Sequence, residues 1–343
     1  MDQLLMTPQE LKTKLPLSLD AAIFLKKISN ETQRLFTSSQ KKVLLIGPCS
    51  IHSFDGALLY AEKLAKLSFE VQDQFVIFMR VHFEKPRTRN SWRGFVYDPD
   101  LRNSFDIEKG LFLSRKLCLE IIKLNLPITT ELLDPFLYPY FSDVLSWGNI
   151  GARTVASPNH RLLASDCLIP IGFKNPLDGD ISSAIYGVEV ATSPHTILSL
   201  NEQGSLIKKP SKGNPFAHLV HRGSISHSNF EKSDLFSSSQ ELKRKNLIYK
   251  ILVDCGHGNS LKLKQGQVFE KVMDDFTFHS TPLLGLMLES YLQAGTYLGS
   301  DIAHAPIDLS ITDPCLSFEE TRELILNAQS KLINSNHSLC LNS

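Results

Sequence analysis

The sequence has no excess of charge of either sign, because its 36 lysine and arginine residues are matched by 36 aspartate and glutamate residues. A formal net charge of zero gives no support for a nucleic-acid or membrane-surface role. No stretch is apolar enough to span a bilayer, and the amino terminus, MDQLLMTPQE, has neither the basic nor the apolar region of a signal peptide. We therefore expect a cytoplasmic protein that binds neither nucleic acid nor membranes.

The cysteines also lack a pattern. Six are scattered along the chain, and no two have the CxxC spacing of zinc or redox motifs. They indicate a reduced protein in which one thiolate could be put to use. The composition, with 42% hydrophobic and 21% charged residues over 343 positions, is typical of a soluble globular protein with a sizeable core.

What the chain does contain is an alternation of apolar runs and helical patterns. The run Val43-Leu44-Leu45-Ile46 leads into a turn at Gly47, and a helical pattern follows over residues 57–67, which makes a βα unit. Strand-like runs recur at residues 43–47, 76–81, 127–131, 149–153, 169–173, 217–222, 249–254 and 283–288, most of them separated by a helical stretch. This pattern predicts an α/β protein with a (β/α)8 (TIM) barrel, and a doubly wound sheet is the alternative.

A helical arm is expected before the barrel, over residues 1–40. Thr7 is a good N-cap residue and Pro8 suits the first helical position, while a second amphipathic run covers residues 18–36. Such an arm packs on a neighbouring surface, either within the subunit or across a dimer.

The barrel itself is predicted over residues 41–333, with two interruptions. Residues 195–216 have the pattern of a β-hairpin inserted before the sixth strand, and the serine-rich residues 224–239 that of a polar surface loop. The last helix opens at Ser317 with a capping-box pattern and runs to about Leu332. Residues 334–343 are expected to form a frayed polar tail.

The second predicted strand ends in an unusual cluster of cations. Residues 76–79 are apolar, yet Arg80 continues the run, and an unpaired charge is too costly to leave in an apolar core, so it should point at an anion. Lys85 and Arg87 flank Pro86, which fixes its own φ and biases the preceding residue towards an extended conformation. The loop is therefore expected to bind phosphate or carboxylate; the alternative is an ordinary strand followed by a solvated basic loop.

In a TIM barrel the catalytic groups gather at the carboxyl ends of the strands. Each of the eight predicted strands delivers a polar group there, and one more follows: Cys49, Arg80 with Lys85 and Arg87, Glu131, Arg153, Lys174, Arg222, His257, Glu289 and finally Asp313. A single strand-end cation is usually a surface residue, but eight strands with such a group at one end are hard to obtain by chance. Five cations would meet at this mouth, Arg80, Lys85, Arg153, Lys174 and Arg222, so the ligand is expected to be strongly anionic.

Four of these residues form a candidate metal-binding set. Cys49, His257, Glu289 and Asp313 offer soft, borderline and hard donors from four different elements. Such a set suits a divalent transition ion such as Mn, Fe, Co or Zn better than Mg or Ca. The alternative is a small buried cysteine and a hydrogen-bonded histidine.

These residues and their motifs resemble the type I 3-deoxy-D-arabino-heptulosonate 7-phosphate (DAHP) synthases, which catalyse the first step of the shikimate pathway to chorismate and the aromatic amino acids. The matching motifs run in family order over about residues 7–330: GPCSIH, MRVxFEKPRT, SWGxIGART, GFKN, HRG, Asp254–Ser260, Glu289-Ser290 and SITD. The likeness is greatest to the aromatic-amino-acid-regulated enzymes. It implies a metal-dependent transferase that condenses phosphoenolpyruvate with erythrose 4-phosphate and water, releasing DAHP and phosphate.

The resemblance also implies a role for each site residue. One divalent metal ion per subunit would be bound by Cys49, His257, Glu289 and Asp313. Phosphoenolpyruvate would be bound by Arg80, Lys85, Arg153, Lys174 and Arg222, and erythrose 4-phosphate by Lys85, Pro86, Arg87, Thr88 and Asp313. The catalytic residues would be Lys85, Glu131, His257 and Asp313, with Glu131 orienting a water near phosphoenolpyruvate.

Two rival functions stay open. The sister enzyme, 3-deoxy-D-manno-octulosonate 8-phosphate synthase, shares the barrel and the phosphoenolpyruvate site but carries an asparagine-containing loop in place of KPRT and uses arabinose 5-phosphate. The KPRT motif of this chain favours erythrose 4-phosphate. The other rival is a non-catalytic anion-binding relative, which should have lost a ligand or a phosphate-binding cation, and none is lost here.

Some positions depart from the family pattern. His82 stands where tyrosine is usual, and residues 135–139 differ from those of the feedback-sensitive members. Leu168 occupies a position where those members have a small residue, and the amino-terminal arm is shorter. We therefore expect weak or absent inhibition by phenylalanine and tyrosine. The arm and the family together suggest a homodimer or a homotetramer.

Overall fold

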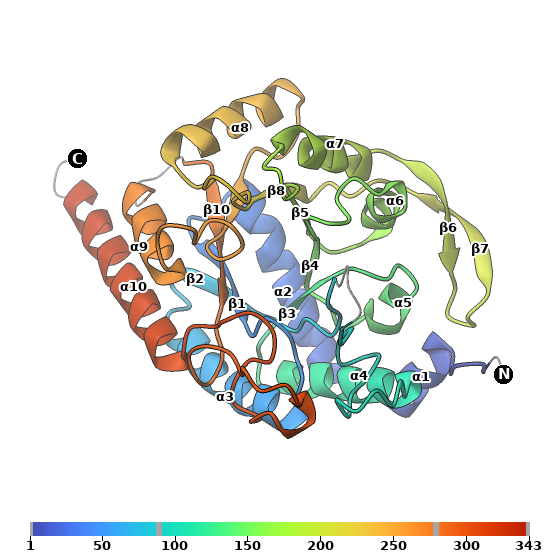
Figure 1. The fold of residues 1–343 in the computed structure, drawn as a ribbon. Coiled ribbons are helices and arrows are strands. Elements are labelled where there is room, and N and C mark those ends of the chain that lie inside the picture. The colour runs from blue at the N-terminus through green and yellow to red at the C-terminus, as the bar shows by residue number, and fades with distance from the viewer. Residues whose placement is uncertain (1–2, 87–90, 277–280, 341–343) are drawn as a thin grey trace.

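The computed structural model describes residues 3–86, 91–276 and 281–340, the last six of these by their backbone only. Eight parallel strands close into a barrel in the order β1-β10-β9-β8-β5-β4-β3-β2 (Figure 1). They are β1 (Lys42–Gly47), β2 (Phe75–Arg80), β3 (Ile128–Glu131), β4 (Trp147–Ile150), β5 (Ile171–Lys174), β8 (Ala217–His221), β9 (Ile251–Asp254) and β10 (Leu283–Glu289). Because β1 pairs with both β2 and β10, the sheet is closed, and the predicted TIM barrel is confirmed over the doubly wound alternative.

Helices surround the barrel as the alternation of patterns predicted (Figure 1). They are α3 (Phe54–Glu70), α4 (Ile107–Lys123), α5 (Tyr138–Phe141), α6 (Pro158–Asp166), α7 (Ile181–Thr192), α8 (Lys232–Arg244), α9 (Gln265–Asp275) and α10 (Phe318–Cys340). A short 3₁₀ turn, η1 (Ile302–His304), lies in the long loop after β10. Among the described residues, none of the helices combines the length and the apolar character that crossing a membrane requires.

The strands are buried on both faces, which explains their nearly continuous apolar runs. Leu44 and Ile46 belong to the larger core cluster, together with residues of the surrounding helices. Val43 and Leu45 alternate with them and belong to a second cluster that fills the barrel. The side chain of Trp147 also lies in this inner cluster and packs between Phe36 and Phe78.

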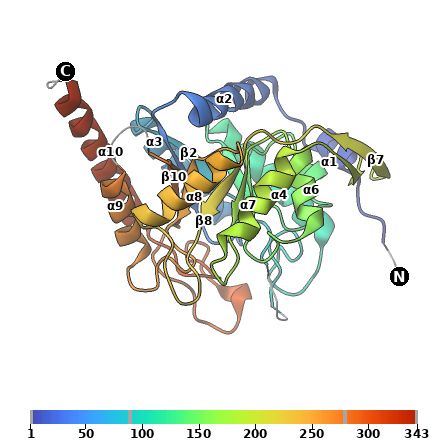
Figure 2. The ribbon, with the colours of Figure 1, turned by 90° about the horizontal axis from the view of Figure 1, so that it is seen from above.

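The amino-terminal arm forms α1 (Pro8–Lys14) and α2 (Leu19–Thr37). Helix α2 lies across one end of the barrel and contributes Phe36 to the inner cluster (Figure 2). Helix α1 packs on the same chain, because Gln9 N donates to the carbonyl of Glu202 at 2.9 Å. The arm thus covers one end of the barrel, and the site is built at the other end, where the strands finish.

The hairpin expected before the sixth barrel strand is present. It consists of β6 (His195–Leu200) and β7 (Leu206–Ser211), which pair antiparallel as a separate two-stranded sheet. The hairpin follows α7 and precedes β8. The turn at its tip contacts α1 through the hydrogen bond from Gln9 N to the carbonyl of Glu202. The insertion therefore extends the side of the barrel without interrupting the strand order.

Two expectations at the polar segments were wrong in part. Residues 224–239 are a loop only as far as Glu231, where α8 begins with a reciprocal capping box between Glu231 and Asp234. The prediction took the serines of this segment as solvent-exposed loop residues, but Ser238 and Ser239 lie on the buried face of α8 with Leu235. The last helix also continues to Cys340, well past Leu332, in a stretch that contains no glycine or proline to stop it.

Candidate active site

The carboxyl ends of the barrel strands surround a cleft of about 610 Å³. Its walls hold most of the residues that the sequence analysis assigned to the site: Lys85, Pro86, Glu131, Arg153, Lys174, Arg222, His257, Glu289 and Asp313. Cys49 and Arg80 are buried and touch this wall through Lys85 and Glu289, respectively. The predicted aldose-binding residues Arg87 and Thr88 lie outside the described residues.

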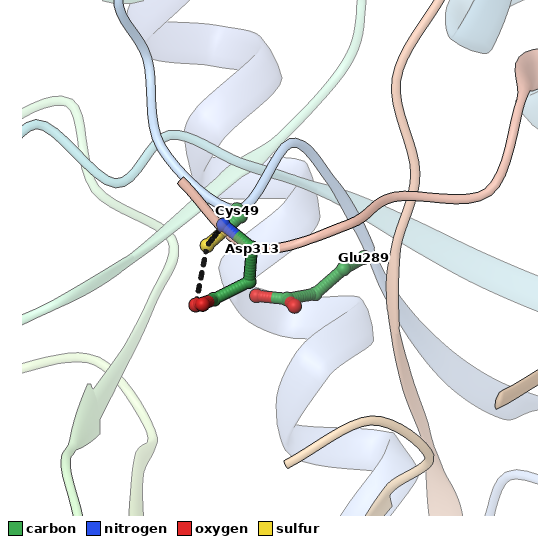
Figure 3. A group of neighbouring side chains, drawn as sticks. All are labelled: Cys49, Glu289 and Asp313. Carbon is green, nitrogen blue, oxygen red and sulfur yellow. Dashed lines mark hydrogen bonds between the residues drawn. The ribbon is translucent and has the colours of Figure 1, made fainter. Parts of the chain in front are cut away.

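Three of the predicted metal donors meet from distant parts of the chain. Cys49 follows β1, Glu289 ends β10 and Asp313 lies in the loop before α10 (Figure 3). One donor atom of each lies within 4.8 Å of the other two. The Cys49 thiol donates to Asp313 Oδ2 at 3.0 Å. One sulfur and two carboxylates fit a divalent transition ion better than Mg or Ca.

His257 approaches this group at Glu289. Its Nε2 is 3.4 Å from Glu289 Oε1, and its Nδ1 is 2.9 Å from Asp254 Oδ2. The Asp254 carboxylate can accept a proton from Nδ1 and so orients the ring with Nε2 towards Glu289, an arrangement common to metal-binding histidines. The fold therefore groups three of the predicted donors, Cys49, Glu289 and Asp313, while His257 approaches them only at Glu289. The chemistry of these side chains fits a divalent transition ion.

The protonation of Cys49 is governed by its neighbours. Burial and the Glu289 carboxylate raise the pKa of the thiol well above its usual value, and Asp313 adds to the rise. The Lys85 ammonium, 2.9 Å from Sγ, acts in the opposite direction. A divalent cation at the same point would favour the thiolate more strongly, because metal binding displaces the proton of a ligating thiol.

Asp254 is a site residue that the sequence analysis did not single out. It is fully buried and accepts from Lys174 Nζ at 2.7 Å and from His257 Nδ1 at 2.9 Å. Burial opposes its ionisation, but His257 and Lys174 hold the pKa of the carboxyl well below its usual range. One carboxylate thus orients both His257, a predicted metal donor, and Lys174, a cation predicted to bind phosphoenolpyruvate. The sequence did contain a signal for Asp254, because it is an acidic residue at the end of a predicted strand, three positions before His257.

The predicted cations differ in their surroundings. Arg80 is buried and donates from its NH2 group to Glu289 Oε1 at 3.0 Å, so it faces a metal donor rather than the open cleft. Its Nε and NH1 have no hydrogen-bond partner among the described residues. Arg222 donates from Nε to the carbonyl of His257 at 3.1 Å, and Arg153 is exposed. Arg80 therefore differs from the other four predicted cations, which line the cleft directly.

Two further contacts position the carboxylates of the site. Gln265, on α9, donates to the backbone carbonyl of Glu289 at 2.8 Å and accepts from its backbone N–H at 3.1 Å. Glu131 lies over Gly151, where a Cβ atom would come within 2.1 Å of Glu131 Oε1. The glycine of the SWGNIGART segment thus makes room for Glu131. Neither relationship was expected from the sequence.

A TIM barrel with several cations around one cleft and a metal-donor set beside it defines an enzyme acting on anionic substrates. A family model described as the DAHP synthetase I family matches residues 26–326. The chain belongs to this family.

Individual relatives agree with this assignment over nearly the whole chain. The phospho-2-dehydro-3-deoxyheptonate aldolase, Tyr-sensitive, of Escherichia coli strain K12 is 37% identical over 94% of this chain and 92% of that protein. The Trp-sensitive aldolase of the same strain is 36% identical over 94% of this chain and 93% of that protein. The solved structure of the phospho-2-dehydro-3-deoxyheptonate aldolase from Francisella tularensis SCHU S4 superimposes with a TM-score of 0.93 at 36% identity, covering 97% of this chain and 98% of that one.

Proposed function

We propose that the chain is a 3-deoxy-7-phosphoheptulonate synthase, which condenses phosphoenolpyruvate with erythrose 4-phosphate and water to give DAHP and phosphate. Membership of the family and the names of the relatives support this reaction. The observation that carries the proposal is one cleft lined by four cations and by three of the predicted metal donors, with the fourth, Cys49, in contact with Asp313 behind the wall. The octulosonate synthase and the non-catalytic relative find no comparable support.

The charges of the cleft suit two phosphate esters. Bringing both substrates together would be prohibitive by Coulomb repulsion in a low-dielectric site without cations. We assign phosphoenolpyruvate to Arg80, Lys85, Arg153, Lys174 and Arg222, of which Arg80 is buried and hydrogen-bonded to Glu289. Erythrose 4-phosphate is assigned to Lys85, Pro86, Arg87, Thr88 and Asp313.

A divalent ion held by Cys49, His257, Glu289 and Asp313 would supply a Lewis acid for the aldehyde of erythrose 4-phosphate, and the donor set suits Mn, Fe, Co or Zn. C3 of phosphoenolpyruvate forms a bond to the aldehyde carbon, water adds to C2, and the bond between C2 and the phosphate oxygen breaks.

The chain's own residues would position these reactants. Lys85 lies between Cys49 Sγ, at 2.9 Å, and Asp313 Oδ2, at 3.9 Å, where its ammonium can hold a proton beside the aldehyde oxygen. Glu131 is assigned to orient the attacking water. Holding both substrates in near-attack geometry could supply roughly 7–11 kcal/mol of the barrier.

The decisive assay is phosphate release from phosphoenolpyruvate with Mn, given either erythrose 4-phosphate or arabinose 5-phosphate, with and without a chelator. We expect release with erythrose 4-phosphate alone, lost on chelation and restored by metal. Preference for arabinose 5-phosphate would indicate the sister enzyme. No release with either sugar would contradict an enzymatic function.

We further propose that the enzyme works in the cytoplasm as a homodimer or a homotetramer. The location rests on the scattered cysteines and on an amino terminus unlike a signal peptide, and the assembly rests on the family resemblance and the helical arm. Light scattering coupled to size exclusion measures the mass in solution. A monomer at micromolar concentration would contradict the assembly.

A further inference from the structure

Glu84 lies directly before Lys85, but its carboxyl group contacts a different set of residues. Its Oε1 accepts from the Tyr97 hydroxyl at 3.2 Å, and its Oε2 accepts from the backbone N–H of Asp134 at 3.4 Å. The same Tyr97 hydroxyl lies 3.2 Å from Asp134 Oδ2. One phenol therefore stands between two carboxyl groups from different loops, one after β2 and one after β3.

The two contacts of the Tyr97 hydroxyl need two protons, one for each carboxyl group. A phenol has one proton to donate, and an ionised carboxylate can only accept. If Glu84 and Asp134 were both ionised, one of the two 3.2 Å contacts would join oxygens that have no proton between them. A proton on Glu84 resolves the conflict, because Glu84 then donates to the Tyr97 oxygen while Tyr97 donates to Asp134.

The surroundings of Glu84 favour that proton. Its carboxyl borders a small apolar hollow lined by Phe83, Val96, Leu137, Tyr138 and Phe141, among others. Burial, together with the charge of Asp134, raises the pKa of Glu84 to about 8, although hydrogen bonds from Asp134 N and Tyr97 oppose the rise.

Other charged and titratable groups also face this cluster. The Arg93 guanidinium stacks on the Tyr97 ring at 4.1 Å, and Lys85 shares a neighbouring hollow with Glu84. Tyr138 and Glu131 line the apolar hollow from the β3 side. Among the described residues, neither cation forms an ion pair with Glu84 or Asp134, whose shared partner is the Tyr97 hydroxyl.

Glu84 also stands where the loop that carries KPRT leaves and rejoins the barrel. Lys85 N donates to the carbonyl of Arg93 at 2.9 Å, and Val96 N donates to the carbonyl of Phe83 at 3.2 Å. Gly94, at φ +120°, packs so closely that a Cβ atom would come within 2.6 Å of the Cα of Glu84. Whatever holds Glu84 therefore holds both ends of this loop.

We propose that Glu84, kept neutral between Tyr97 and Asp134, is a positioning residue that fastens the base of the aldose-binding loop to the loop after β3. This inference rests on the proposed function, because the assignment of KPRT to the aldose is part of it. Ionisation of Glu84 sets two carboxylates against each other across Tyr97 and loosens the loop. Affinity for erythrose 4-phosphate should then fall as the pH rises, while affinity for phosphoenolpyruvate changes little.

The test compares Glu84→Ala, Glu84→Gln and the exposed control Glu62→Gln. We expect Glu84→Ala, which removes the hydrogen bonds to Tyr97 and to Asp134 N–H, to raise the KM for erythrose 4-phosphate about tenfold, or about 1.4 kcal/mol, with an unchanged KM for phosphoenolpyruvate. Glu84→Gln should restore most of this loss, because its amide can donate to Tyr97 without a titrating proton. It should also abolish the rise in KM that the wild type and Glu62→Gln show between about pH 7 and 9.

A second measurement is independent of turnover. The infrared spectrum of the wild-type protein at neutral pH should contain the carbonyl band of a buried protonated carboxylic acid. The spectrum of Glu84→Gln, subtracted from it, should lack this band. The proposal is overturned if that band is missing, or if Glu84→Gln keeps the pH dependence of the wild type. An enzyme that releases no phosphate at any pH would instead refute the proposed function, while the infrared band would still report the proton on Glu84.

Discussion

The sulfur of Cys49 lies 3.0 Å from Oδ2 of Asp313, although 264 positions separate the two residues in the chain. The contact joins the loop after the first strand to the loop after the last. Lys85 approaches both from a third loop, with its ammonium 2.9 Å from the sulfur. The thiol proton fills this contact, and a divalent cation bound by Cys49, Glu289 and Asp313 would displace that proton.

Replacing Cys49 by alanine should abolish metal-dependent phosphate release and leave the fold intact. The thiolate is the soft donor of the set, and without it the remaining oxygen and nitrogen ligands hold a transition ion less tightly. Bound metal per subunit and the thermal midpoint measure the two effects separately. The control is Cys118→Ala, a buried cysteine of α4 that should keep both metal and activity. Near-wild-type turnover with bound metal would remove Cys49 from the site.

Lys85→Ala and Arg87→Ala should have different effects, although the two residues are two positions apart. Lys85 contacts the metal donors, so its loss should lower kcat by about 100-fold or more, as the removal of one electrostatic stabiliser does. Arg87 is assigned to the phosphate of the aldose, so its loss should act mainly on the KM for erythrose 4-phosphate. Steady-state kinetics with each substrate varied would separate these outcomes. Equal effects would argue against this division of the loop.

Asp254→Asn should weaken two bindings at once. The amide can neither neutralise Lys174 nor fix the tautomer of His257, and such partners of metal ligands are typically worth about 10–100-fold in metal affinity or activity. Metal titration and equilibrium binding of phosphoenolpyruvate measure the two losses. Asp166→Asn is the matched control, since Asp166 pairs with Lys209 at 2.7 Å on the outside of the barrel. If phosphoenolpyruvate binding alone changed, Asp254 would have no part in holding His257.

Two buried histidines should make the fold sensitive to acid. Burial lowers the pKa of His218 and of His221 from 6.5 to about 4. The unfolded chain therefore binds these protons first, so stability is fully present above about pH 6.5 and is lost as the pH falls towards 4, by on the order of 3 kcal/mol for each histidine. Glu84, whose pKa is raised from 4.5 to about 8, makes the opposite contribution, since it stabilises the fold as the pH falls. It is a single group, however, and the two histidines outweigh it.

The thermal midpoint should accordingly decrease between about pH 6.5 and 4.5. Imidazole resonances followed by nuclear magnetic resonance provide the residue-specific check. Titration of His218 or His221 at an ordinary pKa would contradict the assignment, whatever the midpoint does.

Inhibition by phenylalanine and tyrosine is expected to be weak or absent. The expectation comes from the altered residues 135–139 and from Leu168, whose side chain is 94% exposed at the end of α6. The relatives from Escherichia coli carry the words Tyr-sensitive and Trp-sensitive in their names, so they are suitable positive controls. More than half inhibition of this enzyme at sub-millimolar phenylalanine or tyrosine would overturn the prediction.

Much of the architecture could be predicted because a TIM barrel is a local pattern repeated along the chain. Each strand is a short apolar run, and several helices carry their own caps, so the eight strands could be located without knowing their neighbours. The failures have the same origin. Ser238 and Ser239 look polar in the sequence, but small hydroxyl side chains fit a buried helix face, and only packing against the barrel reveals this.

The sequence by itself determined the barrel, the polar group at each strand end and the family resemblance, because these depend on residue type and order. The tertiary structure decided which groups meet. It placed Asp254 between Lys174 and His257, turned Arg80 towards Glu289, and set Tyr97 between Glu84 and Asp134. Most of these partners come from different strand ends and loops, and their distances depend on barrel closure, which no local pattern encodes.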